Sequence, residues 1–425
     1  MSISPEIHKA YVDILHEELK PAMGCTEPIA VAYAGALARQ TLGSIPDVVE
    51  LTVSGNIIKN VKSVIVPHTG GQRGLRTAVG AGIICGNADK ELEVISDVTV
   101  DMLADLKSYL RNAKIVIERS KSNCPFDIQV KVFKGRDSAF VRIVTSHTNV
   151  VRIEKNGEVL QSKEFSEEAT EPPKNRSLLT VENIVNFANE VNIDDVKDVL
   201  DRQIEYNYGI AKEGLMNDYG ANVGKIFALT TSKNVWNRAI AYAAAGSDAR
   251  MNGCEMPVVI NSGSGNQGMA ASIPVIIYAE ELGASDELRY RALCVSNLVT
   301  IHLKTGIGSL SAYCGATSAG TGAAAGICYL CDGDYNEIAH TIINALAINS
   351  GMICDGAKAS CAAKIASAVQ SGILAWTMGK QGSQFVDGDG IVIRGVEDTI
   401  KAVSRIAREG MRSTDAEIID IMIKE

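Results

Sequence analysis

The stretch FDIQVKVFKGRDSAFVRIVTSHTNVVRIEKNGEVLQS, residues 126–162, alternates apolar and polar side chains along most of its length. A period of two is typical of β-strands with one buried face. An Asn-Gly pair near its end is a strong hairpin-turn signal. KIVIERS, residues 114–120, adds another such strand, and residues 97–112 predict a helix before it. We therefore predict a small α+β domain over residues 89–175, closed by the polar, proline-containing segment 164–177.

The sequence on both sides of this stretch is helical in pattern and rich in small residues. NVWNRAIAYAAAGSDARM, residues 234–251, is typical of the alanine-rich segments that follow. Before the stretch, a helix begins near Pro28, since proline is favoured in a first turn. The chain has 38 glycines and only 5% aromatic residues, so small side chains do much of the packing. We expect a mainly α protein, whose discontinuous Gly/Ala-rich helical domain, residues 1–88 and 176–425, carries the α+β domain as an insertion.

Composition and charge argue against two classes of function. The net charge is −9 and the sequence has no basic run, which argues against a nucleic-acid-binding surface. The N-terminus lacks the pattern of a signal peptide, so ten cysteines indicate reduced thiols in the cytoplasm. The charge-free segment 309–331 is long enough to span a bilayer. It consists mostly of Gly, Ala, Ser and Thr, so we expect a tightly packed helix and no membrane span.

Two glycine-rich loops are similar to each other. VIVPHTGGQRG (64–74) and VVINSGSGNQG (258–268) both place an apolar triplet before a Gly/Ser/Thr loop and a helix-like run. Such loops can present backbone N–H groups at helix N-termini, which suits a carboxylate or a phosphate. Two ordinary glycine-rich turns are the alternative interpretation.

Three late cysteines differ in setting from the other thiols. GMICDGAKASCAAK, residues 351–364, holds Cys354 and Cys361, and Cys314 stands in AYCGA. Each lies where a helix begins or ends among glycines, so backbone N–H groups can approach a bound group closely. Three thiolates would hold three irons of a [4Fe–4S] cube and leave the fourth open to substrate. The alternative is that each cysteine is a small buried hydrophobic residue.

A CxxC pair, Cys328 and Cys331, suggests either zinc or redox chemistry. The zinc interpretation needs a second such pair or two histidines, and the redox interpretation needs a thioredoxin-like βαβ context. The sequence supplies neither, so we expect a structural role for this pair.

The motif GCTEPIA (24–30) occurs together with GSGNQG (263–268), HTN (147–149) and the three late cysteines. On these motifs the chain resembles, over essentially its whole length, the bacterial and archaeal L-cysteine desulfidases. Those enzymes are relatives of the α chain of iron–sulfur L-serine dehydratases. His68 departs from the family pattern, in which a smaller residue often stands, and the roles of His68 and His147 stay open.

The resemblance implies a site and a reaction. Cys314, Cys354 and Cys361 would ligate an oxygen-sensitive [4Fe–4S] cluster, and Cys25 would be the catalytic residue. The implied reaction converts L-cysteine to pyruvate, ammonia and sulfide without the electron sink of pyridoxal phosphate. An iron with an open site would supply Lewis acidity. We expect Cys25 to be the base, because a helix N-terminus lowers a thiol pKa, although Glu27 opposes this by like charge.

The carboxylate of a small amino-acid substrate also needs hydrogen-bond donors. The candidates are the polar residues of the two loops, for which simple loop capping is the alternative: Thr69, Ser262, Ser264, Asn266 and Gln267.

Three other functions remain open at this stage. The same residues would serve an L-serine dehydratase, which loses water in place of sulfide. NSGSGN (261–266) would cradle the phosphate of a pyridoxal-phosphate lyase, but no lysine stands out as its Schiff-base residue. A small-molecule sensor or transporter component is the alternative that is not an enzyme. Small-residue helices also make a homodimer plausible.

Overall fold

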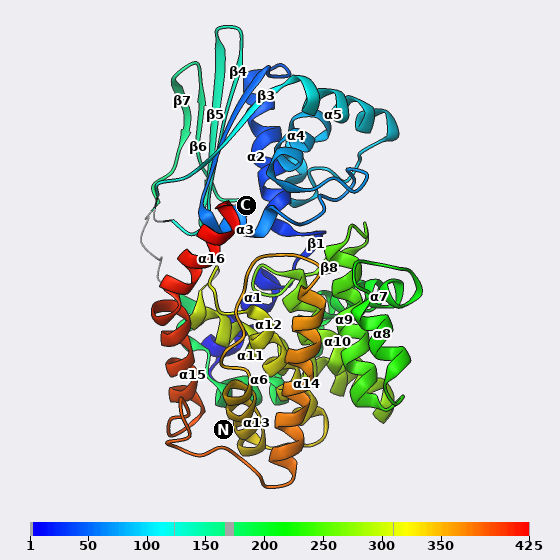
Figure 1. Cartoon of the computed structure of the whole chain (residues 1–425). Coiled ribbons are helices and arrows are strands. Elements are labelled where there is room, and N and C mark those ends of the chain that lie inside the picture. The colour runs from blue at the N-terminus through cyan, green and yellow to red at the C-terminus, as the bar shows by residue number, and fades with distance from the viewer. Residues whose placement is uncertain (1–2, 123, 166–173, 309, 425) are drawn as a thin grey trace.

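The computed structural model describes residues 3–122, 124–165, 174–308 and 310–424. It has a helical bundle and a smaller part built on a β-sheet (Figure 1), which confirms the predicted mainly α fold with an inserted α/β region. The bundle contains α1 (Pro5–Glu18), α6 (Val181–Glu190), α7 (Lys197–Met216), α8 (Val223–Thr230), α9 (Val235–Met251), α10 (Gly265–Leu282), α11 (Asp286–Ile307), α12 (Gly315–Leu330), α13 (Tyr335–Ile348), α14 (Cys361–Lys380) and α15 (Val396–Arg405). The π-helix η4 (Ile406–Gly410) then leads into α16 (Arg412–Lys424).

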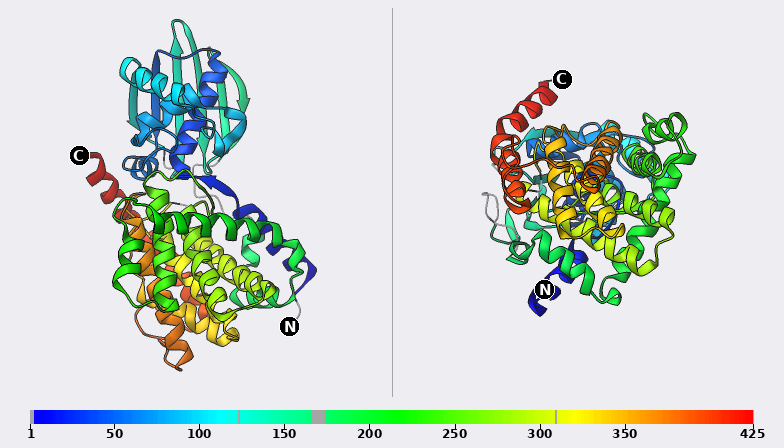
Figure 2. Two further views of the ribbon diagram at one scale, coloured as in Figure 1. Left: turned by 90° about the vertical axis from the view of Figure 1, so that its right-hand side faces the viewer. Right: turned by 90° about the horizontal axis from the view of Figure 1, so that it is seen from below.

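The smaller part is a six-stranded sheet with helices on one face. Its strands lie in the order β3-β2-β4-β5-β6-β7, and only β2 and β3 are paired in parallel. They are β2 (Val48–Val53), β3 (Lys114–Arg119), β4 (Asp127–Lys134), β5 (Asp137–Val144), β6 (Val150–Lys155) and β7 (Glu158–Ser162). The helices are α2 (Thr26–Leu42), α3 (Gly55–Val61), α4 (Gly74–Cys85) and α5 (Val100–Asn112). Figure 2 shows these helices beside the sheet, and one apolar core joins them to it.

This packing differs from the predicted boundary at residue 88. Strand β2 lies inside the sheet between β3 and β4, and α2 and α4 pack on that sheet. The reason is that VVELTV, residues 48–53, is a short strand whose partners all come later in the chain. The helices on either side of β2 therefore bury their apolar faces against the sheet. How the chain divides into separately folding domains stays a prediction.

Helix α12 lies at the centre of the bundle and contains most of the charge-free segment. It packs against α10, α11, α13 and α14, and nearly all of its residues are buried. A Cβ at Gly320 would lie 2.5 Å from the carbonyl oxygen of Ala368, so only glycine permits this approach of α14. Within the part of the chain that the structure describes, no helix has the length and apolarity to cross a membrane.

Besides the covalent chain, a pair of short strands and the C-terminal helix join the two parts. Strand β1 (Pro21–Met23) pairs antiparallel with β8 (Pro257–Val259). The C-terminal helix α16, red in Figure 1, leaves the bundle and packs on α3. Both connections border the region where the two parts meet, and this region contains the candidate site.

Candidate active site

A cavity of about 570 Å³ lies between the two parts. Residues at the N-terminal ends of four helices line it: Cys25 before α2, Ser264 before α10, Cys314 before α12 and Cys361 at the start of α14. A helix N-terminus carries free N–H groups and a partial positive charge, which stabilise anions. The cavity therefore suits a negatively charged group.

Backbone pairing brings two of the late cysteines together. Tyr313 and Ile353 form an antiparallel bridge, and the N–H of Cys354 donates to the carbonyl of Ala312 at 2.6 Å. The Cys314 thiol consequently donates a hydrogen bond to the Cys354 sulfur. Cys361 follows after a short turn and lines the same cavity. The fold thus gathers all three sulfurs on one wall of the cavity, although 47 residues separate the first from the last.

The pKa values of the three thiols are shifted in different directions. The hydrogen bond from Cys314 lowers the pKa of Cys354, and Lys59 and Lys364 assist while burial opposes the shift. The same hydrogen bond and burial raise the pKa of Cys314, and burial raises that of Cys361. Binding a cationic centre through three thiolates would therefore release protons.

The donor set fits an iron–sulfur cluster. Cysteine thiolates are the usual protein ligands of such clusters, and four lysines line the same cavity: Lys20, Lys59, Lys304 and Lys364. Burial lowers the pKa of Lys304 to about 8, against the effect of the nearby Cys354 and Cys314 charges. Among the described residues, no three Cys, His, Asp or Glu side chains are arranged around a single metal ion. A cube presents separate iron corners, so its thiolates stand farther apart than the ligands of one ion.

Cys25 lines the same cavity from the sheet part, at the N-terminus of α2. It is 2% exposed, and its thiol donates to Glu27 Oε2 at 3.2 Å. Asn60 donates to the other oxygen of Glu27 at 3.0 Å and fixes the carboxylate in place. Burial and the Glu27 charge raise the pKa of Cys25 well above its ordinary value. The expected lowering by the helix N-terminus is therefore wrong, because burial and Glu27 outweigh it.

The sequence analysis missed Arg250, which lines the cavity from the end of α9. It is 3% exposed, its Nη1 donates to Asn266 Oδ1 at 3.2 Å, and its Nε has no partner. Within the described chain it has no carboxylate partner. A buried charge without a counter-ion is costly, so this guanidinium is suited to bind an anion. The sequence gives no signal of this role, because an arginine in an alanine-rich helix is most simply a surface residue.

Other described residues of the cavity lining also carry buried polar atoms without a hydrogen-bond partner. Among these atoms are Nε2 of His147 and Oε1 of Gln267. The ring of His147 packs edge-on against Phe126 with centroids 4.9 Å apart, and burial lowers the pKa of the imidazole. A neutral imidazole is thus available to a bound molecule, and it comes from the sheet side of the cavity.

The two similar loops differ in position. Ser262, Ser264, Asn266 and Gln267 line the cavity. Thr69 lies outside the lining, because its hydroxyl donates to the carbonyls of Val66, at 2.7 Å, and Gln72, at 3.3 Å. His68 is outside it too, with Nδ1 3.2 Å from Glu255. The loop at 258–268 contributes to the cavity, and in the loop at 64–74 Thr69 caps its own turn.

The chain is similar in sequence to one family of known proteins. The serine dehydratase alpha chain family matches residues 89–420. A UPF0597 protein of Desulfitobacterium hafniense is 53% identical over 418 residues, which are 98% of this chain and 97% of the relative. UPF0597 proteins of Lachnoclostridium phytofermentans and Treponema denticola are 49% and 44% identical, over 98% and 100% of this chain and 100% of each relative. These matches confirm the predicted relationship, and the chain belongs to the serine dehydratase α-chain family.

Proposed function

We propose that this member of a lyase family is an iron–sulfur-dependent L-cysteine desulfidase. One observation supports the proposal: Cys25 and the three late cysteines line one and the same cavity. The ligands would be Cys314, Cys354 and Cys361. When bound, a [4Fe–4S] cluster would supply a Lewis-acidic iron corner that stabilises the departing sulfur of the substrate.

Arg250 would bind the carboxylate of the substrate. A guanidinium offers planar, paired donors that match a carboxylate, and the Nε of Arg250 is buried and without a partner. Ser262 and Ser264 stand on the neighbouring loop with their hydroxyls at the cavity. The unpaired Nε2 of His147 would accept a hydrogen bond from the substrate ammonium. Together these groups would direct the α-hydrogen of the substrate toward Cys25.

Cys25 would take the α-proton in concert with Glu27. The thiol proton already lies in a hydrogen bond to the Glu27 carboxylate, so its transfer leaves a thiolate in the cavity. The thiolate takes the α-proton, the bond between Cβ and sulfur breaks, and sulfide leaves. Aminoacrylate then tautomerises to an imine, and water hydrolyses it to pyruvate and ammonia. No electrons are gained or lost overall.

L-serine is the second candidate substrate, and the name of the matching family favours it. The same binding and proton-transfer groups would serve it, with water leaving in place of sulfide. Either enzyme would act on a free amino acid in the cytoplasm, where ten free thiols persist in reduced form. A homodimer remains part of the proposal and rests on small-residue helices alone.

The test is a paired assay on protein purified and reconstituted without oxygen. Iron and acid-labile sulfide are measured per chain, and pyruvate release is followed from L-cysteine and L-serine at equal concentrations. We expect iron-dependent release that is faster from L-cysteine. Faster release from L-serine would assign the chain to the second candidate. Fully loaded protein that releases pyruvate from neither substrate would contradict both, and an aldimine absorption band would indicate a pyridoxal-phosphate enzyme instead.

A further inference from the structure

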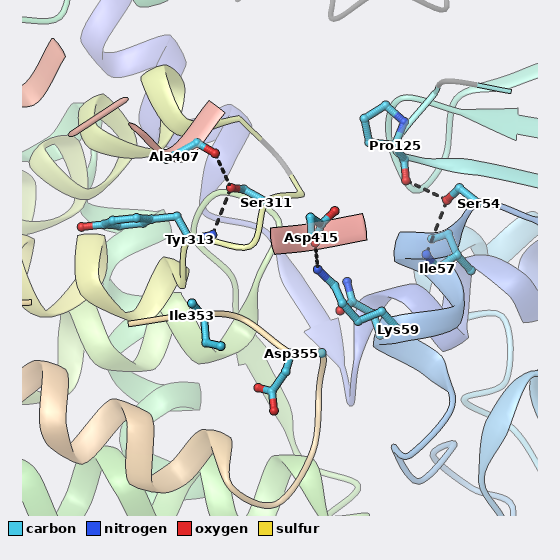
Figure 3. Close-up of polar contacts among 12 residues, drawn as sticks. Ser54, Ile57, Lys59, Pro125, Ser311, Tyr313, Ile353, Asp355, Ala407 and Asp415 are labelled. Carbon is cyan, nitrogen blue, oxygen red and sulfur yellow. Dashed lines mark hydrogen bonds and ion pairs between the residues drawn. The ribbon is translucent and has the colours of Figure 1, made fainter. Parts of the chain in front are cut away.

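The C-terminal segment contacts both sides of the candidate cluster site. On the bundle side, the Ser311 hydroxyl donates to the carbonyl of Ala407 at 3.1 Å and accepts from the N–H of Tyr313 at 3.0 Å (Figure 3). On the sheet side, Lys59 Nζ of α3 donates to Asp415 of α16 at 2.5 Å. The segment therefore holds the turn before Cys314 and the helix that carries Lys59.

Lys59 lies directly against the loop that carries Cys354. A Cβ at Gly356 would lie 2.1 Å from the Lys59 carbonyl oxygen and 3.1 Å from its Cγ, and Gly356 has a φ of +92°. The Lys59 side chain is 1% exposed and lines the cavity. Its ammonium is thus held between the Asp415 carboxylate and the thiolate side of the cavity.

The ion pair between Lys59 and Asp415 is not the only contact that holds α16 in place. Ile419 packs on Gly55, where a Cβ would come within 2.9 Å of it, and Arg119 pairs with Asp420 at 3.1 Å on the surface. A buried ion pair seldom stabilises a fold more than apolar residues of the same size would. A second role for the Lys59 charge accounts for its position in the cavity that the three cysteines line.

We propose that Lys59 is a positioning residue for the metal cluster, and that Asp415 of the C-terminal helix holds it in place. The ammonium compensates the negative charge of the three thiolates and keeps the Cys354 loop against α3. The C-terminal helix thereby controls how firmly the cluster is retained. This inference rests on the proposed function, because it requires that the three cysteines hold a cluster.

The test measures iron retention, not turnover. Lys59→Met and Asp415→Asn proteins are reconstituted without oxygen, and the rate of iron transfer to a coloured chelator is compared with that of the wild type. We expect Lys59→Met to lose iron about 10- to 100-fold faster, the range typical of outer-shell changes at metal sites. Asp415→Asn should lose it several-fold faster, because Lys59 remains but its anchor is gone.

Asp420→Asn is the matched control, because it removes an exposed ion pair of the same helix. It should release iron at the wild-type rate. Circular dichroism melting of the metal-free proteins reports whether they fold. If Lys59→Met does not fold, the iron-release rates of Asp415→Asn and Asp420→Asn are compared with each other to test the inference. Equal rates of iron release from Asp415→Asn and Asp420→Asn would overturn this inference and leave the proposed function intact. Iron release at the wild-type rate from folded Lys59→Met would do the same. A wild-type protein that takes up no iron overturns the proposed function and this inference with it.

Discussion

The bundle and the sheet part each contribute a side of the cavity, the bundle wall and the sheet wall, and they carry thiols whose pKa values shift in opposite directions. On the bundle wall, Cys354 accepts a hydrogen bond and faces lysines, and its pKa falls to about 5. On the sheet wall, Cys25 donates a hydrogen bond to Glu27, and its pKa rises well above the ordinary value. Burial raises the pKa of both thiols, so it does not account for the opposite directions of the two shifts. The hydrogen bond from Cys314, assisted by the lysines, lowers the pKa of Cys354, whereas the Glu27 charge adds to the raised pKa of Cys25.

The largest effect is expected on the bundle wall. Cys354→Ser removes one of the three proposed cluster ligands, so the reconstituted protein should retain little iron and show no cluster-dependent activity. Iron and acid-labile sulfide per chain measure this directly. Cys294→Ser is the control, since Cys294 is a buried cysteine of α11 that lies outside the cavity lining. Wild-type iron content in Cys354→Ser would contradict the assignment of the bundle wall to cluster binding.

A change on the sheet wall should have the opposite effect, with iron retained and activity lost. Cys25→Ala should keep its iron and lose about 10²- to 10⁴-fold in kcat, the usual contribution of a positioned acid or base. Steady-state kinetics on protein of known iron content separates the two effects. Full activity in this variant would show that another group takes the α-proton.

Glu27→Gln tests the hydrogen-bonded pair of Cys25 and Glu27. We expect a loss in kcat of about 100-fold, the lower end of that range, because the thiol loses its proton acceptor. The Glu27 charge raises the pKa of Cys25, so removing it should lower that pKa. In metal-free protein the pH dependence of Cys25 alkylation, followed by mass spectrometry, should therefore move to lower pH. An unchanged profile would mean that burial alone holds the thiol protonated.

Arg250 belongs to the bundle but acts, in the proposal, on the substrate and not on the cluster. Arg250→Met should lower kcat/KM about 10- to 100-fold, the value of a charge-assisted hydrogen bond to a carboxylate, with unchanged iron. Arg238→Met is the matched control, because Arg238 lies on the same helix and pairs with Glu281 at the surface. Equal kcat/KM in the two variants would place the substrate carboxylate elsewhere.

The sequence predicted those parts of the molecule that depend on local pattern. Strict alternation revealed β4 to β7, and the hairpin turn has positive φ at Asn156 and Gly157 as an Asn-Gly turn requires. It missed β2, because a six-residue strand has no local signal of the sheet that it joins. Arg250 was missed for the same reason: its function depends on which side chains it meets, and those lie far away in the chain. The pKa of Cys25 was mispredicted because the helix position is local, whereas burial is not.

The similarity of the two glycine-rich loops shows the limit of motif reasoning and gives the smallest expected effect. Thr69→Ala should lower the free energy of unfolding by about 1 kcal/mol, since one hydroxyl donor to two carbonyls is lost. Its KM should stay at the wild-type value. Ser264→Ala removes the N-cap of α10 and should cost a similar free energy. Because Ser264 also lines the cavity, this variant should raise KM as well. Denaturant unfolding of both variants, combined with their kinetics, therefore separates a loop that only folds from one that also binds; a raised KM in Thr69→Ala would restore the symmetric site that the sequence suggested.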